Sequence, residues 1–390
     1  MSVPRLRLRR PLARTIRRGH PWVYREALDG RIPPPGTEVV VTDEHGRGLG
    51  RGLADAGPIG VRLWTVGEEP VDEALWERRL DAALELRRRV VPRKTDALRL
   101  VHGEGDRMPG LVVDLYGPHA VVALDGESLL PHREALLSVL RPRLHALGVP
   151  SILGRWGPRG DRSVELLEGP SPPEVVEVHE HGMVLCVDLR RGQKTGLFLD
   201  QRDSRAMVRR LARGRRVLDL YSYVGGFSVA AGKGGASSVL TVDLAKPAIA
   251  LARRAWAANG LAPQRQRAEA ADVPELLERL RAQGERFGLV VADPPSFAPS
   301  ADARERALRS YGKLHQACLE LLSPGGLLLA GSCSSHVDRE AFEGALQQAA
   351  ERVRCVLQVV ERAAAPADHP RLLAFPEGDY LTVTLVRRLD

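Results

Sequence analysis

VLDLYSYVGGFSVAAGKGGASSVLTVD, residues 217–243, contains a strand, a glycine turn, a helix and a second strand. The apolar run at 217–220 predicts a buried parallel strand, because such strands carry apolar residues on both faces. Gly225 and Gly226 break the pattern, a helical segment follows, and a second apolar run ends at Asp243. Glycines let the backbone approach a ligand, and a strand-end acid can accept hydrogen bonds from ribose hydroxyls.

The glycine turn differs from the G-x-G-x-x-G fingerprint of dinucleotide-binding folds. Asp219 also lies where the pyrophosphate of NAD would meet a like charge at high cost. The sulfonium and amino groups of S-adenosylmethionine suit this acid better. The loop therefore favours S-adenosylmethionine as the ligand, and an NAD-dependent dehydrogenase is the less favoured alternative.

Length and composition set broad limits on the fold. At 390 residues the chain should hold two or three domains. No apolar run reaches the ~18 residues of a membrane span, and the basic N-terminus lacks the apolar core of a secretory signal. The four cysteines show no C-x-x-C pairing, which argues against a zinc site or disulfides and suits a reducing cytosol. We expect a cytoplasmic protein with no metal site.

The charge balance points to a polyanionic partner. The formal net charge is +8, and residues 1–20 contain seven arginines and no acid. Such a basic arm or strand edge is suited to contacting the phosphates of a nucleic acid. Trp22, Tyr24 and Trp64 could stack on bases, although at least one of them is expected to fill a small core instead.

The order of the elements predicts three domains. Short β-rich runs separated by Gly and Pro predict a barrel-like module at 1–70, and a mixed α/β pattern predicts a central domain at 71–182. Alternating strands and helices at 183–390 predict a doubly wound parallel sheet, the Rossmann-like architecture. Functional groups of such a sheet lie at the carboxyl ends of its strands. The side chains expected there are Asp219, Asp243, Asp293 and Cys333.

Several motifs carry a family resemblance. Residues 293–297 read DPPSF and resemble the D/N-P-P-Y/F motif of methyltransferases that act on amino groups or bases. Further motifs are HPWVY at 20–24, GEGDRMPG at 103–110, GQKTGLFLDQRDSR at 192–205, SCS at 332–334, ADHP at 367–370 and FPEG at 375–378. Together they resemble the bacterial large-subunit (23S) ribosomal RNA cytosine-5 methyltransferases over essentially the whole chain. That resemblance implies an RNA-binding PUA domain, a central domain and a class I methyltransferase domain, in this order.

The resemblance also implies site residues. Asp219, Gln201, Asp243 and Asp272 would bind the methionine, ribose and adenine parts of the donor, and Asp293 would face both the donor and the target base. The other donor-binding positions would be Tyr221, Ser222, Tyr223 and Gly225. The substrate-binding positions would be Lys194, Arg202, Pro294, Pro295 and Phe297.

Cys333 is the implied nucleophile. Cytosine C5 is a poor nucleophile, and a thiolate that adds at C6 makes C5 able to take the methyl group. A free cysteine has a pKa of ~8.5, and the segment after Cys333 resembles a helix N-terminus that could lower it. No cysteine stands beside the two prolines, so the base that removes the C5 proton is unidentified.

Two other functions stay open from the sequence. Residues 196–200, GLFLD, also resemble relatives that methylate guanine N7, so a guanine or adenine nitrogen is an alternative target. A non-catalytic RNA-binding assembly factor is the other, although Asp293 and Cys333 argue against it. The sequence leaves the target nucleotide and the oligomeric state open, with a homodimer as one option.

Overall fold

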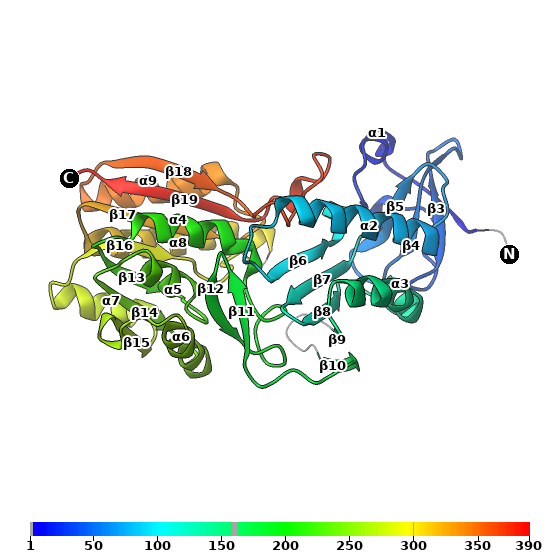
Figure 1. Cartoon of the computed structure of the whole chain (residues 1–390). Helices are drawn as coiled ribbons and strands as arrows, with labels where there is room; N and C mark the ends of the chain where they lie inside the picture. The colour runs from blue at the N-terminus through cyan, green and yellow to red at the C-terminus, as the bar shows by residue number, and fades with distance from the viewer. Residues whose placement is uncertain (1–2, 158–162, 299) are drawn as a thin grey trace. The chain divides into compact units, whose positions relative to one another are not determined.

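A computed structural model describes residues 3–157, 163–298 and 300–390 (Figure 1). The chain forms two compact units, each built from separated segments. The first unit contains Met1–Glu174, Leu189–Thr195 and Ala367–Gly378, and the second contains Val175–Asp188, Gly196–Pro366 and Asp379–Asp390. The expected α/β class is confirmed, and the division at residues 70 and 182 stays a prediction.

A curled five-stranded sheet opens the first unit. Its strands lie in the order β1-β3-β4-β5-β2, with β1 parallel to β3 and the other pairs antiparallel. The strands are β1 (Arg5–Arg7), β2 (Trp22–Tyr24), β3 (Glu38–Thr42), β4 (Gly48–Ala54) and β5 (Ile59–Val66), with the short helix α1 (Ala13–Arg17). Trp64 is buried and packs on Trp76, whereas Tyr24 is 39% exposed. The prediction that at least one of these aromatic residues fills a small core is therefore confirmed for Trp64.

A second sheet, in the order β10-β9-β8-β7-β6, completes the first unit. Its strands are β6 (Ala97–His102), β7 (Leu111–Tyr116), β8 (His119–Leu124), β9 (Ser151–Trp156) and β10 (Ser163–Glu168). The helices α2 (Glu73–Val90) and α3 (Arg133–Ala146) bury their apolar sides in a shared core with this sheet. Asp72 begins α2 by accepting a hydrogen bond from the Leu75 amide at 2.9 Å, which satisfies one of the free amides of the first turn.

The N-terminal arginines are paired with carboxylates. Arg7 and Arg9 both contact Asp29, at 2.6 and 3.3 Å, and Arg5 contacts Glu68 at 3.2 Å. The arginine side chains of these pairs are 47–60% exposed, so water screens the pairs and they contribute little to stability. Residues 5–7 therefore form an edge strand, and carboxylates partly compensate the positive charge of the arginines in this segment.

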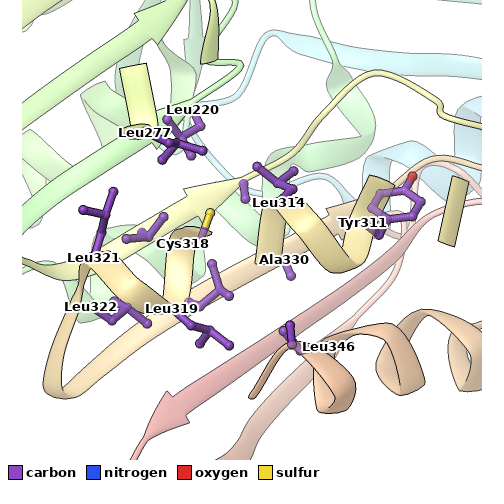
Figure 2. Packing of buried hydrophobic residues seen from close by; sticks show 14 of the residues in the cluster. Leu220, Leu277, Tyr311, Leu314, Cys318, Leu319, Leu321, Leu322, Ala330 and Leu346 are labelled. Atoms are coloured by element: carbon purple, nitrogen blue, oxygen red, sulfur yellow. The ribbon is translucent and has the colours of Figure 1, made fainter. Parts of the chain in front are cut away.

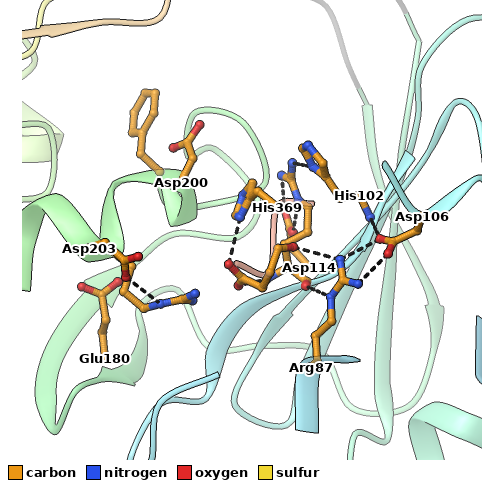
Figure 3. Close-up of polar contacts among 12 residues, drawn as sticks. Arg87, His102, Asp106, Asp114, Glu180, Asp200, Asp203 and His369 are labelled. Atoms are coloured by element: carbon orange, nitrogen blue, oxygen red, sulfur yellow. Dashed lines mark hydrogen bonds and ion pairs between the residues drawn. The ribbon is translucent and has the colours of Figure 1, made fainter. Parts of the chain in front are cut away.

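The late segment Ala367–Gly378 is fixed to the first unit by buried polar contacts (Figure 3). Arg87 of α2 holds Asp106 through two bonds of 2.6 Å and also donates to the carbonyl oxygen of Asp368 at 2.8 Å. The Asp368 carboxylate accepts from the Arg99 amide at 3.1 Å. A Cβ at Gly105 would meet the Pro370 carbonyl oxygen at 1.8 Å, so only glycine permits this approach.

A seven-stranded sheet forms the second unit, in the order β15-β14-β13-β16-β17-β19-β18, with only β19 antiparallel to its neighbours. The strands are β13 (Arg216–Leu220), β14 (Ser238–Asp243), β15 (Gln266–Ala270), β16 (Phe287–Ala292), β17 (Leu322–Ser332), β18 (Leu357–Ala363) and β19 (Thr382–Arg388). The ladder between β16 and β17 jumps from Leu322 to Leu327, so the Ser-Pro-Gly-Gly segment at 323–326 is a bulge within β17. A separate hairpin consists of β11 (Val176–Glu180) and β12 (Met183–Val187).

Helices cover both faces of this sheet. They are α4 (Arg202–Leu211), α5 (Gly226–Lys233), α6 (Lys246–Ala258), α7 (Val273–Ala282), α8 (Arg304–Leu321) and α9 (Arg339–Val353). The chain moves from β13 through β14 to β15 in one direction across the sheet, and from β16 to β17 in the opposite direction. Because parallel crossovers are right-handed, this reversal places α5 and α6 on one face of the sheet and α7 and α8 on the other. The reversal of strand order between β13 and β16 creates the crevice in which such sheets bind ligands.

The main core of the second unit lies under α7, α8 and α9. Figure 2 shows Cys318, Leu319 and Tyr311 of α8 among the buried residues of this core, which also include Ala330 of β17. Tyr311 is fully buried yet carries a hydroxyl, which must find a partner at low dielectric. Its partners belong to the candidate site described below.

A buried ion pair fixes the hairpin to the second unit. The Arg205 guanidinium contacts both oxygens of Glu180, and the two side chains are 3% and 0% exposed. Arg205 also donates to the carbonyl oxygen of Phe198 at 3.0 Å and packs where a side chain at Gly226 would collide. One arginine thus positions β11, the 196–201 segment and the start of α5.

Replacing Arg205 with Met should lower the free energy of unfolding by about 3–5 kcal/mol, because Glu180 would be left charged and buried without a partner. Arg210→Met on the same helix is the matched control, since Arg210 is 61% exposed and its pair with Glu361 lies at the surface. Urea denaturation measures the free energy of unfolding of both variants. Equal losses in the two variants would contradict the importance of the buried pair.

Candidate active site

Three carboxylates gather at the carboxyl ends of neighbouring strands. Asp219 lies near the end of β13, Asp243 ends β14, and Asp293 directly follows β16. The pKa of Asp219 is raised to about 7, first by burial and further by the negative charges of Asp243 and Asp293, although hydrogen bonds from Ser228 act in the opposite direction. The expected clustering of these three acids is therefore present in the second unit, and it creates a site that favours a cation.

One oxygen of Asp219 is satisfied and the other is not. Oδ2 accepts from the Ser228 hydroxyl at 2.6 Å, and that hydroxyl also contacts Oγ1 of Thr241 at 2.7 Å. Oδ1 is buried and has no hydrogen-bond partner within the described chain. A buried carboxylate oxygen without a donor is costly, so this atom marks a position for a ligand donor.

The loop after β13 has an unusual backbone conformation. Tyr221 and Tyr223 adopt φ values of +56° and +48°, which non-glycine residues rarely adopt. Such residues are found mainly where a binding site needs the geometry. Gly225 has φ +75°, and a Cβ there would meet Cβ of Ala252 at 2.6 Å, so the turn passes too close to α6 for any side chain.

Asp243 fixes this loop from the next strand. Its Oδ2 accepts from the Tyr223 amide at 2.8 Å, and its Oδ1 accepts from the Ala245 amide at 2.9 Å. Each carboxylate oxygen has a second lone pair, so both can still accept from ribose hydroxyls. The Tyr223 hydroxyl donates to the carbonyl oxygen of Gly196 at 3.0 Å, which ties the loop to the 196–201 segment.

Asp293 is held between Gln201 and Gly331. Gln201 is 3% exposed, and its amide nitrogen donates to Oδ2 of Asp293 at 2.8 Å. A Cβ at Gly331 would meet Oδ1 of Asp293 at 2.4 Å, so the carboxylate lies directly against the backbone of β17. The amide oxygen of Gln201 is buried without a hydrogen-bond partner among the residues described. It is a second position to which a ligand can donate.

The two serines beside Cys333 are anchored, and Cys333 itself is half-buried. The Tyr311 hydroxyl contacts Oγ of Ser332 at 2.9 Å and Oγ of Ser334 at 3.0 Å. Ser334 in turn contacts Oγ of Ser296, in the DPPSF segment, at 3.1 Å. The buried Tyr311 thus links the end of β17 to the loop after β16, and this explains the Ser-Cys-Ser pattern.

The other three cysteines are in different environments. Burial raises the pKa of Cys186 to about 11 and that of Cys318 to about 12, and it also raises the pKa of Cys355. A thiol with a raised pKa is a poor nucleophile at neutral pH. The helix after Cys333 begins only at Arg339, where the Asp338 carboxylate caps it by accepting from the Ala341 amide at 2.8 Å. The expected helix N-terminus is therefore several residues away from the thiol.

The remaining predicted site residues have varied positions. Asp272 is exposed and caps α7 by accepting from the Glu275 amide at 3.2 Å. Ser222 is buried, and its hydroxyl has no partner among the residues described. Arg202 is 1% exposed, while Lys194 is exposed and belongs to the first unit. Contacts of these residues with donor or substrate stay predictions.

A cavity of about 520 Å³ adjoins this edge of the sheet in the second unit. Tyr221 and Phe297 line it, together with side chains of α7 and α8 such as Leu277 and Leu314. Phe297 rests on Tyr311, with ring centroids 4.9 Å apart. Pro294 is buried and Pro295 is exposed, so the DPPSF segment presents one proline and part of an aromatic ring to solvent.

Comparison with known proteins identifies the family. Residues 148–377 match the family described as S-adenosylmethionine-dependent methyltransferase, and residues 6–65 match a PUA-like domain. A ribosomal RNA large subunit methyltransferase I from Erwinia tasmaniensis is 36% identical over 388 residues and covers 97% of each chain. The chain belongs to the S-adenosylmethionine-dependent methyltransferases. A ribosomal RNA large subunit methyltransferase from Deinococcus radiodurans is 37% identical and covers 99% of this chain and 98% of its own length.

Solved structures share the fold of this methyltransferase. A protein from Streptococcus mutans assigned as a SAM-dependent methyltransferase has a TM-score of 0.88 and 22% identity, covering 98% of this chain and all of its own. A second methyltransferase structure, solved with SAH, has a TM-score of 0.86 and 22% identity, covering 99% of this chain and all of its own. The likeness confirms the predicted fold, including the PUA-like N-terminal module.

The strand-end residues fit S-adenosylmethionine. The unpartnered Oδ1 of Asp219 suits its amino group, and the open lone pairs of Asp243 suit its ribose hydroxyls. The excess negative charge at the site also favours a cationic ligand. In the part of the chain that the structure describes, no group of His, Cys, Asp or Glu side chains is arranged to hold a metal ion, and no helix is long and apolar enough to cross a membrane.

Sequence reasoning missed several supporting residues. Ser228 and Thr241 orient Asp219, Tyr311 anchors the segment around Cys333, and the Tyr380 hydroxyl donates to Oδ2 of Asp200 at 2.7 Å. Ser228 lies only two residues after Gly226, so the glycine loop itself was a signal for it. Tyr311 has the spacing of an ordinary core residue of α8, and nothing in the sequence marks it.

Donor affinity should rise with pH. The raised pKa of Asp219, about 7 against an ordinary value near 3.8, means that a proton competes with the cationic donor below neutrality. We expect S-adenosylmethionine to bind about tenfold more tightly at pH 8 than at pH 6, measured by calorimetry. The free protein should lose stability as pH rises from about 4 to about 7, because the buried group must then ionise.

Asp219→Asn is the control for this prediction. The variant should bind the donor more weakly and lose most of the pH dependence over the same range. A wild-type affinity that is flat from pH 6 to pH 8, or a variant with the same pH profile as wild type, would contradict the assignment of Asp219 to the donor.

Proposed function

We propose that this methyltransferase forms 5-methylcytosine in large-subunit ribosomal RNA and that Cys333 is its nucleophile. The observation that carries the proposal is the anchoring of the Ser332–Ser334 segment by the Tyr311 hydroxyl and, through Ser334, to Ser296 of the DPPSF loop. It holds the half-buried Cys333 directly after β17, the neighbour of β16, and Asp293 directly follows β16. The names of the full-length relatives support the RNA substrate, and the net charge of +8 is consistent with it.

The reaction needs a covalent step because C5 of cytosine is not nucleophilic by itself. The Cys333 thiolate adds to C6, so an S–C6 bond forms and the ring electrons move toward C5. C5 then takes the methyl group that the bound donor supplies. A base removes the C5 proton, the S–C6 bond breaks, and the aromatic ring and the thiolate are restored.

Asp293 is proposed to position the target base. Addition at C6 places negative charge on the ring, mainly at N3 and O2, and a protonated or hydrogen-bonded carboxyl at this place would offset it. Gln201 and the backbone of Gly331 fix the carboxylate, so it is preorganised before substrate binds. Phe297, supported by Tyr311, would offer the base an aromatic surface. The residue that accepts the C5 proton is not assigned.

The central test is methyl transfer from labelled S-adenosylmethionine to unmodified large-subunit ribosomal RNA, followed by nucleoside analysis. Wild type should place label in 5-methylcytosine, and Cys333→Ala should reduce the rate at least 10³-fold while donor affinity is unchanged. Cys318→Ala, the matched control, removes a buried thiol that plays no part in the chemistry. It should retain activity at a temperature where it is folded.

Label in a purine that persists in Cys333→Ala would overturn the proposal. The protein would then be one of the nitrogen-methylating enzymes, with Cys333 in a structural role. No transfer to any RNA by wild type would support a non-catalytic assembly factor instead.

Tyr311→Phe should reduce turnover without weakening donor binding. The substitution keeps the ring in the core and removes only the hydroxyl that links Ser332 and Ser334. Because a misplaced catalytic group loses much of its effect, we expect a fall of about 10- to 100-fold in kcat. Tyr116→Phe is the control, since its hydroxyl contacts Thr195 in the first unit. Equal turnover in Tyr311→Phe and wild type would show that this link does not position the nucleophile.

A further inference from the structure

The GEGDRMPG motif at 103–110 borders a cavity that the proposed chemistry does not use. The cavity has a volume of about 330 Å³ and lies in the first unit, between α2 and the turn at 103–107. Its charged lining residues are Glu69, Arg78, Arg79, Asp106 and Arg107. Two of these three arginines, Arg79 and Arg107, have no carboxylate partner among the residues that the structure describes.

The two acids of the cavity are already neutralised. Asp106 is held by both terminal nitrogens of the buried Arg87 at 2.6 Å, and it also accepts from the His102 amide at 2.6 Å (Figure 3). Glu69 pairs with Arg78. The remaining charges of the lining are Arg79 and Arg107, so the cavity carries an uncompensated positive charge.

Arg79 is a buried cation with only neutral partners. It is 6% exposed, and its guanidinium donates to the carbonyl oxygens of Arg107 and Trp64. No carboxylate of the described chain lies within 4.0 Å of it. Its pKa is lowered to about 9 by burial and then by the positive charge of Arg107, while the negative charge of Glu69 offsets this only in part, so Arg79 is charged at neutral pH in surroundings that compensate it poorly. An anion in the cavity would supply that compensation.

The backbone conformation of Arg107, the second arginine of the cavity, is unusual. Its backbone has φ +58°, in the left-handed region, where it closes the short helical turn at 103–106. Glycine would adopt this conformation at lower cost. An exposed arginine in this position therefore suggests that its side chain has a function beyond the turn.

We infer that Arg79 and Arg107, in the first unit, form a phosphate-binding subsite for the backbone of the RNA substrate. The guanidinium group matches phosphate geometry, and a phosphate at this place would be bound by charge and shape and would carry no base specificity. The inference rests on the proposed function for the identity of its ligand as RNA. It assigns to the first unit a contact that orients the substrate and leaves the chemistry unchanged.

Arg107→Gln tests the inference without disturbing the core, because Arg107 is exposed. Affinity for unmodified large-subunit ribosomal RNA is measured from 50 to 300 mM salt with the full chain. The loss of one phosphate contact should weaken binding and reduce the slope of log K against log salt by about 0.7–1. Arg107→Lys keeps the charge and should retain most of the slope.

Arg88→Gln is the matched control. Arg88 is on the same helix, nine residues after Arg79 and therefore on the opposite side of α2, and it is 67% exposed with only a loose contact to Glu85. Its loss removes the same formal charge. If Arg107→Gln and Arg88→Gln show the same slope, the subsite is overturned.

Experiments with inorganic phosphate distinguish RNA from a free anion as the ligand of the subsite. At fixed ionic strength, replacing chloride by phosphate should raise the melting temperature more for wild type and Arg88→Gln than for Arg107→Gln. The difference between variants is the readout, because phosphate stabilises most folded proteins. An equal rise in all three would overturn the subsite. A rise that depends on Arg107, with no change in the RNA slope, would overturn RNA as the ligand.

The outcomes of these binding experiments do not depend on which nucleoside is methylated. Label in a purine would overturn the proposed reaction and leave the Arg107-dependent slope unaffected. An unchanged slope, with 5-methylcytosine still formed, would overturn the subsite alone. A wild-type protein without affinity for the RNA would overturn both.

Discussion

The site depends on the burial of one carboxylate beside two others at one edge of a parallel sheet. Asp219, Asp243 and Asp293 end three adjacent strands, and Asp219 is fully buried with one oxygen unsatisfied. Such an arrangement is unfavourable in the free protein, and a cationic ligand relieves it. The surrounding contacts, from Ser228 to Gln201, hold the acids in place despite their repulsion. The same charges that reduce stability therefore select the donor.

A second theme is the use of buried arginines to join distant parts of the chain. Arg205 connects the hairpin to the glycine loop of the second unit, and Arg87 fixes the late segment 367–378 to the first unit. Both are paired with carboxylates and are almost fully buried. Arg79 is also buried, at 6% exposed, but has no carboxylate partner in the described parts of the chain, and this contrast is the reason to assign it a ligand.

Much of the fold was readable from local patterns. The apolar runs and the glycine turn predicted β13, α5 and β14, and the alternation that followed predicted a doubly wound sheet. The chain order of the strands does not reveal which ones are neighbours, yet the strand-end rule still placed Asp219, Asp243 and Asp293 together. The sequence could not show that residues 367–378 return to the first unit, because that depends on the carbonyl contact at Gly105 and the bonds of Arg87.

By itself, the sequence determined the class of fold, the family and the chemical types at the strand ends, because strand periodicity, glycine turns and strand-end acids are local features. Only the tertiary structure decided which of these groups lack partners. Burial raises the pKa of Asp219 to about 7, Tyr311 and Ser334 link the Ser332–Ser334 segment to the DPPSF loop, and Arg79 has no carboxylate partner among the described residues. Burial and pairing depend on residues far apart in the chain, so no local pattern records them.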